Sequence, residues 1–392
     1  MNDWLSVAGA LPEDHERAGL VGRVWMPNLH GPLVAHVKGD SLYDLSRIAP
    51  TCSELLNLPD PLGAIRDAGE LSPVGSLSDV LANSAPETRH GRAPWLLAPC
   101  DLQPVKASGV TFVASLLERV IEEQARGNAQ RAERLRSAIV SVIGNSLHDV
   151  RPGSADAMRL KEILIDQGVW SQYLEVGIGP DAEIFTKCPP MAAVGTGAEV
   201  GIHSQSEWNN PEPEIVLAVS NTGRAMGAAL GNDVNLRDFE GRSALLLGKA
   251  KDNTASCAIG PFIRLFDEHF TLDDVRQCDV ALHIQGPEGF RFTGCSSMAE
   301  ISRDPLEIVE HTIGPNHQYP DGVMLFLGTM FAPTVDRFAP GKGFTHVPGD
   351  IVTVATPKLG TLVNRVNHSD AIEPWTFGVG ALMRNLARRG LL

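Results

Sequence analysis

Three acidic residues stand on two segments that the sequence predicts to pair as a β-hairpin. Glu212 and Glu214 are two positions apart, and this spacing places both carboxylates on the same face of a strand. Residues 215–219 (IVLAV) are apolar and largely β-branched, which favours a strand, and residues 220–223 (SNTG) supply a turn. If residues 222 and 223 form the tip, Glu212 pairs directly with Asp233. The sequence therefore brings three carboxylates together.

Three carboxylates this close require a counter-charge. Directly opposed residues on paired strands have Cβ atoms roughly 5 Å apart, so the acids would repel one another or bind protons. A divalent cation removes the repulsion, and a set of oxygen ligands favours Mg²⁺, with Mn²⁺ or Ca²⁺ as alternatives, over Zn²⁺. The alternative interpretation is an acidic strand edge in contact with solvent, because charged edges commonly protect sheets from aggregation.

The composition fits a globular protein with one large core and a smaller domain. The chain has 392 residues, of which 43% are hydrophobic and 20% are charged. Its 38 Gly and 27 Pro are spread along the chain, which favours turns and short strands over a helical bundle. We expect a mixed α+β, β-rich fold, with a small N-terminal α/β domain over residues 1–95 and a catalytic domain over residues 96–392.

Charge and cysteine content limit the partners and the compartment. The formal net charge of −14 argues against binding to nucleic acid or to an anionic membrane surface, and it leaves room for a local basic pocket. The six cysteines form no C-x-x-C pair, which is typical of reduced cytosolic thiols. The first residues show no signal peptide, and no segment reaches the ~18 apolar residues of a membrane-spanning helix. A cytoplasmic location is therefore expected.

Local patterns predict the elements that position the acidic hairpin. Apolar residues at helical spacing indicate a helix over residues 113–123, and the pattern changes to short strands after residue 183. Thr271 followed by Asp274 resembles a capping box, and Asp304 indicates another helix start. Further helices are expected at 53–56, 78–81, 129–142 and 155–167, and strands at 21–25, 32–37, 41–45, 280–284, 324–327, 351–355 and 362–366.

Several motifs follow one another along the chain. They are Lys187 with Pro189-Pro190, residues 208–214 (WNNPEPE), 231–234 (GNDV), Arg237-Asp238, Glu240-Gly241, Ala250-Lys251, 256–261 (SCAIGP) and Leu327-Gly328-Thr329. In this order the sequence resembles the fumarylacetoacetate hydrolase superfamily over roughly residues 98–385. Within that superfamily it is most similar to the 2-keto-3-deoxy-D-pentonate dehydratases that act on the arabinonate and xylonate type of substrate.

This resemblance implies a fold and a metal site. The family fold is a mixed β-sandwich roll, and its members are usually homodimers or homotetramers. The family's divalent metal, usually Mg²⁺, is held by the residues that correspond to Glu212, Glu214 and Asp233. These are the same three acids that the hairpin geometry brings together.

The resemblance also implies an active-site lysine and substrate contacts. The family's lysine corresponds to Lys251, counted back from residues 260 and 261, while Lys249 lies two positions off the pattern. Lys187 and Thr329 match motif positions that we expect to bind substrate. The alternative for Lys251 is a solvated surface lysine, and for Thr329 a buried threonine bonded to backbone.

One departure from the family pattern concerns a predicted lid helix. Hydrolases of the superfamily carry an aromatic residue, then His and Glu, where this chain has Phe112, Ser115 and Glu118. Serine replaces the histidine that would help to activate water, which argues against C–C bond hydrolysis. Glu118 is the candidate for proton transfer. Ser115 and Arg119 share a helix face and could bind the substrate, unless Arg119 pairs with a glutamate on a solvated helix.

The resemblance implies a metal-dependent hydro-lyase that acts on a small keto acid. We expect dehydration of 2-keto-3-deoxy-D-pentonate to 2,5-dioxopentanoate, in non-phosphorylative pentose catabolism, with Lys251 and Glu118 as the catalytic residues in either order of acid and base. No dinucleotide fingerprint or P-loop is present. The alternatives are an acylpyruvate or fumarylpyruvate hydrolase or a diene-dioate isomerase of the same superfamily, and a non-catalytic keto-acid-binding protein.

Overall fold

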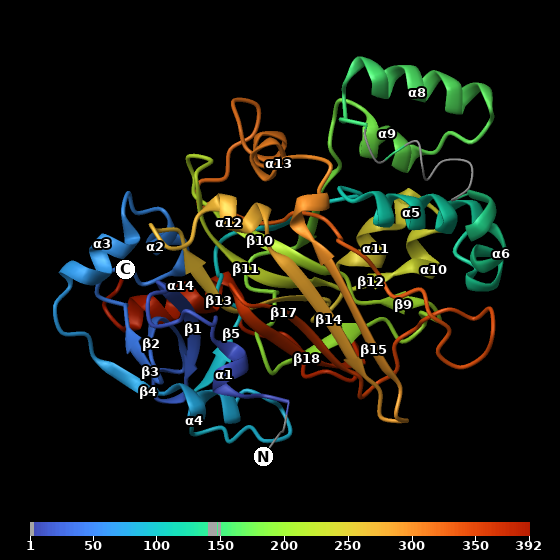
Figure 1. The fold of residues 1–392 in the computed structure, drawn as a ribbon. Helices are drawn as coiled ribbons and strands as arrows, with labels where there is room; N and C mark the ends of the chain where they lie inside the picture. The colour runs from blue at the N-terminus through green and yellow to red at the C-terminus, as the bar shows by residue number, and fades with distance from the viewer. Residues whose placement is uncertain (1–3, 140–146, 148–149) are drawn as a thin grey trace.

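The computed structural model describes residues 4–139, 147 and 150–392, and it is organised around two main β-sheets (Figure 1). The strands are β1 (Leu20–Met26), β2 (Gly31–Lys38), β3 (Ser41–Asp44), β4 (Pro73–Ser76), β5 (Trp95–Leu97), β6 (Val105–Ser108), β7 (Ile184–Cys188), β8 (Glu199–Ile202), β9 (Asn209–Asn210), β10 (Pro213–Val219), β11 (Ala225–Asp233), β12 (Asn235–Leu236), β13 (Cys257–Leu265), β14 (Asp279–Gln285), β15 (Arg291–Ser297), β16 (Val323–Phe326), β17 (Ile351–Thr356) and β18 (Gly360–His368). The larger sheet has the order β4-β3-β2-β1-β13-β11-β10-β16-β6-β7, with β5 paired to β1. The smaller sheet has the order β15-β14-β17-β18-β8, and β9 pairs with β12.

The N-terminal strands extend the larger sheet. β1 pairs antiparallel with β13, with Leu20 opposite Arg264. The C-terminal helix α14 (Val379–Arg388) packs on β2, and the side chain of Asn385 donates a hydrogen bond to the carbonyl of Leu29 at 2.8 Å. The domain boundary at residue 95 stays a prediction, and the residues on its two sides contribute strands to one sheet.

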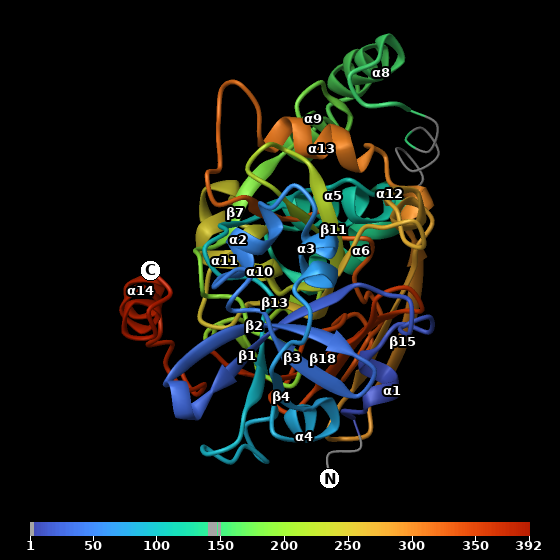
Figure 2. The ribbon, with the colours of Figure 1, turned by 90° about the vertical axis from the view of Figure 1, so that its left-hand side faces the viewer.

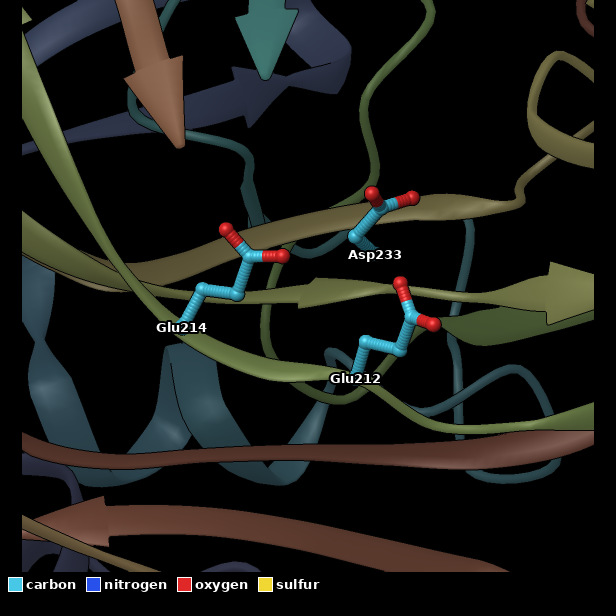
Figure 3. A group of neighbouring side chains, drawn as sticks. All are labelled: Glu212, Glu214 and Asp233. Atoms are coloured by element: carbon cyan, nitrogen blue, oxygen red, sulfur yellow. The ribbon is translucent and has the colours of Figure 1, made fainter. Parts of the chain in front are cut away.

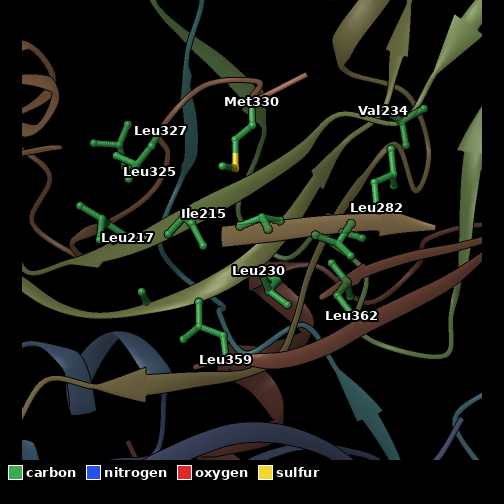
Figure 4. Close-up of a cluster of buried hydrophobic side chains, with 14 of the residues drawn as sticks. Ile215, Leu217, Leu230, Val234, Leu282, Leu325, Leu327, Met330, Leu359 and Leu362 are labelled. Carbon is green, nitrogen blue, oxygen red and sulfur yellow. The ribbon is translucent and has the colours of Figure 1, made fainter. Parts of the chain in front are cut away.

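The main hydrophobic core lies between the two sheets (Figure 4). Ile215 of β10, Leu282 of β14 and Leu362 of β18 belong to this one cluster of buried side chains. Val216 faces the other side of β10, where a second buried cluster includes residues of α2 (Cys52–Leu56). Because apolar clusters cover both faces of the large sheet here, the β10 sequence after Glu214 is continuously apolar.

The β10–β11 hairpin has the predicted register at its acidic end. The backbone amide of Asp233 donates to the carbonyl of Glu212 at 3.0 Å. The turn is centred on residue 222 and not between residues 222 and 223 as predicted, because the amide of Ser220 donates to the carbonyl of Arg224 at 2.9 Å. A β-bulge beside residues 218 and 219 compensates for this difference and restores the predicted pairing toward the open end.

A layer of helices covers the end of the sheets that lies opposite the N-terminal strands (Figures 1 and 2). It contains α5 (Val113–Ala125), α6 (Ala129–Ile139), α8 (Ala155–Asp166) and α9 (Gln172–Ile178), with α10 (Arg237–Glu240) and α11 (Leu247–Lys251) beneath α5. The remaining helices are α1 (Val7–Ala10), α3 (Pro61–Asp67), α4 (Leu77–Ala82), α12 (Leu272–Arg276) and α13 (Pro305–Thr312). The end of the helix predicted over 129–142 lies outside the described residues.

Local signals in the sequence placed several of these elements correctly. Thr271 and Asp274 form the capping box of α12, and Asp304 caps α13.

All six cysteines are free, and five of them are buried. Among the described residues, no helix combines the length and the apolar character needed to cross a bilayer.

Candidate active site

The three predicted acids meet at the open end of the β10–β11 hairpin (Figure 3). Glu212 precedes β10, Glu214 is the second residue of that strand, and Asp233 is the last residue of β11. Their side chains point toward one another, and one oxygen from each lies within 4.8 Å of the others. Their exposed fractions are 0%, 0% and 1%. This burial contradicts the alternative of a solvated strand edge.

The charges around the acids favour a divalent cation. Burial raises the pKa of Glu214 well above its usual value, and the negative charges of Asp233 and Glu212 raise it further. The surrounding cluster holds six carboxylates and four cationic groups, so two negative charges remain when all are ionised. These groups are Glu122, Glu183, Glu212, Glu214, Asp233 and Glu240, with Arg119, Lys187, Arg237 and Lys251. A divalent cation would balance this excess, and the carboxylate donor set suits a hard ion such as Mg²⁺.

Lys251 lies against two of the acids. Its ammonium donates hydrogen bonds to Glu212 and to Asp233, the latter at 3.0 Å. Burial alone would lower the pKa of Lys251, but the charges of Asp233 and Glu212 outweigh burial and raise it, so the group stays charged. Lys249 is exposed and lies over the ring of Phe239, 5.0 Å from its centre. The motif spacing therefore selected the lysine that reaches the acids.

Lys187 lies behind Asp233 and does not line the cavity described below. It is fully buried, and its ammonium is 2.8 Å from Asp233 and 3.0 Å from the carbonyl of Val234. It also donates to the carbonyl of Lys251. The predicted substrate contact of Lys187 stays a prediction, and these protein acceptors enclose its ammonium.

Arg119 connects the lid helix to the acids. Its guanidinium donates to Glu122 on the same helix and to Glu212, and it is 3.2 Å from Glu240. Arg237 approaches Glu122 from the other side at 3.1 Å. The predicted pairing with a glutamate of the same helix is present, but the arginine is buried and the pair belongs to the site rather than to a solvated surface.

A narrow cavity adjoins the acids and Lys251. It encloses about 10 Å³, which is roughly the space of one water molecule. Three predicted substrate contacts, Ser115, Arg119 and Thr329, line it, and the Thr329 hydroxyl donates to Glu214 at 3.2 Å. The complete lining is Ser108, Gly109, Val110, Ser115, Arg119, Glu183, Phe185, Asp233, Glu240, Lys251 and Thr329.

Glu118 lies away from this cavity. It does not line the cavity, although it stands only three residues after Ser115 on the same helix. Its carboxylate forms an ion pair with Arg136 of α6. The predicted role of Glu118 in proton transfer stays a prediction, and this ion pair holds its side chain toward the helix layer.

Glu183 occupies the cavity wall and was not among the predicted site residues. It immediately precedes β7, and its carboxylate approaches Gly109 so closely that a Cβ on that glycine would lie 1.8 Å from an oxygen. Burial and the charge of Glu240 raise the pKa of Glu183 to about 7. The sequence signal was weak, since Glu183 belongs to none of the quoted motifs and stands four residues before Lys187.

Comparison with known proteins finds a family domain over the part of the chain that carries the three acids. Residues 174–367 match the family model described as fumarylacetoacetate (FAA) hydrolase C-terminal. The chain is 32% identical over 184 residues to 2-dehydro-3-deoxy-D-arabinonate dehydratase of Saccharolobus solfataricus, covering 47% of this chain and 58% of that protein. It is 28% identical over 194 residues to a probable 2-keto-3-deoxyxylonate dehydratase of Haloferax volcanii, covering 50% and 63%. The chain thus matches less than two thirds of the length of these curated relatives.

Solved structures share the fold. A 2-keto-3-deoxy-D-arabinonate dehydratase complexed with magnesium and 2,5-dioxopentanoate aligns with a TM-score of 0.59 at 20% identity, covering 89% of this chain and 99% of that chain. A 5-carboxymethyl-2-hydroxymuconate delta-isomerase from Mycobacterium smegmatis aligns with a TM-score of 0.51 at 16% identity, covering 89% and 98%. The predicted β-rich, mixed α+β fold of the fumarylacetoacetate hydrolase type is confirmed. On these matches, the chain carries a domain of the fumarylacetoacetate hydrolase family over residues 174–367 and has the fold of the 2-keto-3-deoxy-D-arabinonate dehydratases.

Proposed function

We propose that this protein is a metal-dependent hydro-lyase that converts 2-keto-3-deoxy-D-pentonate to 2,5-dioxopentanoate. The observation that carries the proposal is the buried group of Glu212, Glu214 and Asp233, with the ammonium of Lys251 at 3.0 Å from Asp233 beside a cavity. The names of the two curated relatives and the ligands of the solved dehydratase indicate the same substrate class. The substrate's 2-keto and carboxylate oxygens are suited to chelating a cation held by three carboxylates.

The reaction removes one water molecule in balanced steps. A base takes a proton from carbon 3, and the C4–O bond breaks as a proton is delivered to the leaving hydroxyl. Loss of a proton from carbon 5 and addition of a proton at carbon 3 then give an enol between carbons 4 and 5. Addition of a proton at carbon 4 and loss of the proton from the carbon 5 hydroxyl convert this enol to the aldehyde. A divalent cation would supply electron withdrawal from the 2-keto group, which acidifies the proton on carbon 3.

The chain's own residues divide the remaining work. Glu183 is our candidate for moving protons, because its carboxylate lines the cavity while Glu118 is paired with Arg136. A carboxyl with a pKa near 7 can both accept and donate a proton close to neutral pH. Lys251 stabilises negative charge that develops on the substrate, since its own charge is maintained by the neighbouring acids.

Substrate entry requires the cavity walls to separate. The enclosed space of about 10 Å³ is too small for a five-carbon acid. Helix α5 carries two lining residues, Ser115 and Arg119, and forms one wall. We propose that α5 moves outward to admit substrate and that Ser115, Arg119 and Thr329 then contact it.

A dehydratase assay with and without chelator tests the proposal. Purified protein is incubated with 2-keto-3-deoxy-D-pentonate, and formation of 2,5-dioxopentanoate is followed directly. We expect turnover to disappear after EDTA treatment and to return with Mg²⁺ or Mn²⁺. Cleavage of an acylpyruvate without any dehydration would favour a hydrolase, although Ser115 stands where those enzymes carry histidine. Tight keto-acid binding without turnover would favour a binding protein.

A further inference from the structure

A second and larger cavity lies apart from the acidic site. It encloses about 400 Å³, which is within the size range of small-molecule sites, and it shares no lining residue with the cavity beside Lys251. Its walls come from β1, β5, residues 191–195, residues 254–255 and the segment 372–377 before α14. Segments from both ends of the chain therefore meet here.

Aromatic rings form much of its wall. Trp25 and Trp95 stack with ring centres 5.6 Å apart and an angle of 22° between their planes. Phe377 meets Trp25 edge-on at 4.9 Å. Trp375 stands at the rim, 48% exposed, with its indole N–H bonded to the carbonyl of Phe377 at 3.0 Å. Such faces suit a flat apolar ring, which gains most of its binding energy by stacking.

One arginine that lines this cavity, Arg89, has a hydrogen-bond donor without a partner among the described residues. The guanidinium of Arg89 lies over the ring of Trp95, 4.9 Å from its centre, and donates to the carbonyl of Ser84 at 2.6 Å. Its Nε is buried and has no partner among the described residues. Arg23, the other lining arginine, donates instead to the backbone carbonyl of Cys100. Burial lowers the pKa of Arg89, against the opposing charges of Glu373, which stands exposed at the rim, and of Glu199 and Glu87.

The backbone around the cavity is strained at two positions. Met191 has φ 70° and Ala255 has φ 59°, a left-handed conformation that residues with a side chain rarely adopt. Both residues line the cavity. Backbone strain of this kind is concentrated at ligand clamps and other functional sites.

We propose that this cavity binds a small planar aromatic anion. The ring stacks against Trp25 and Trp95, and the acidic group accepts a hydrogen bond from the unpartnered Nε–H of Arg89. An aliphatic anion would lose the stacking, and a neutral aromatic molecule would leave the buried Nε of Arg89 without a charged acceptor. The site is independent of the proposed reaction.

Binding of 2-naphthoate, measured by isothermal titration calorimetry, tests this site. We expect saturable binding to the full-length protein and at least tenfold weaker binding of decahydro-2-naphthoate and of 2-naphthamide. Arg89→Gln should weaken 2-naphthoate binding tenfold or more, whereas Arg92→Gln, an exposed arginine on the same loop, should leave it unchanged. Trp95→Leu should weaken binding similarly, with Trp170→Leu as the control outside the cavity.

Several results would overturn the proposal. Equal affinity for the saturated and aromatic acids would remove the role of the rings, and equal losses in the two arginine variants would remove the role of Arg89. Absence of binding by all three probes would contradict the site itself. If Trp95→Leu instead converts an oligomer to monomers in light scattering, this surface is a contact between subunits.

Discussion

Replacing Lys251 by methionine should separate the catalytic role of this lysine from metal binding. Its ammonium contacts Glu212 and Asp233, and its exposed fraction is 3%. Methionine retains the length and apolar character of the side chain but leaves the carboxylates without that cation. The excess of two negative charges in the cluster then becomes three.

The substitution should lower turnover without lowering metal affinity. Removal of an electrostatic stabiliser costs about 10²–10³ in kcat, equivalent to about 2.7–4 kcal/mol of transition-state stabilisation. Removal of a cation that competes for the same carboxylates should leave Mg²⁺ affinity unchanged or increase it. Without metal, the variant should lose about 3–5 kcal/mol of stability, because one partner of a buried ion pair is missing.

The assay measures kcat with saturating Mg²⁺, Mg²⁺ affinity by calorimetry, and folding by circular dichroism. Lys249→Met is the matched control, because Lys249 is two positions away and exposed, and its kcat should stay within a few-fold of the parent value. Normal turnover of Lys251→Met, or an equal loss in Lys249→Met, would refute the assignment. A loss of Mg²⁺ affinity that parallels the loss of kcat would show that Lys251 acts only by maintaining the metal site.

Other substitutions test the remaining parts of the site. Asp233→Asn should keep the circular dichroism spectrum and lower Mg²⁺ affinity at least tenfold, since one of three anionic ligands becomes neutral; unchanged affinity would exclude Asp233 as a ligand. Glu183→Gln should lower kcat about 10²–10⁴-fold, while Glu118→Gln should change it only a few-fold. Because the pKa of Glu183 is raised to about 7 and the base must be ionised, kcat/KM should fall as the pH drops below about 7, and a flat profile down to pH 5 would contradict this role. Lys187→Met should lower the thermal midpoint, because removing one partner of a buried ion pair leaves the other uncompensated and costs about 3–5 kcal/mol; an unchanged midpoint would show that the contact with Asp233 is not stabilising.

The arrangement of the three acids could be predicted from the sequence because it depends on local rules. Two-residue periodicity placed Glu212 and Glu214 on one face, and hairpin pairing brought Asp233 opposite Glu212. The predicted centre of the turn was wrong by half a residue. The bulge near residue 218 shifts the register back, so the pairing at the acidic end still agrees with the prediction. Pairing near the turn is therefore less predictable than pairing at the acidic end.

Contacts between distant segments could not be predicted in the same way. The approach of Glu183 to the cavity depends on Gly109, which directly follows β6 and has no Cβ to obstruct the carboxylate. The orientation of Glu118 depends on how α6 places Arg136 against α5. Neither arrangement leaves a periodic signal in the sequence. The sequence therefore points to Glu118, which stands on the helix that carries Ser115 and Arg119, rather than to Glu183, which lines the cavity.

The net charge of the buried cluster bears on the proton transfer proposed for Glu183. With a divalent cation bound, the six carboxylates and four cationic groups of the cluster would be balanced, whereas the carboxylate of the substrate would add one further negative charge. The group that can absorb this charge at low cost is Glu183, whose pKa is raised to about 7 by burial and by Glu240. Substrate binding would thus raise its proton affinity and favour capture of the carbon 3 proton, which can then be delivered to the departing hydroxyl. The same excess of carboxylates that calls for a cation also prepares one of them to transfer protons.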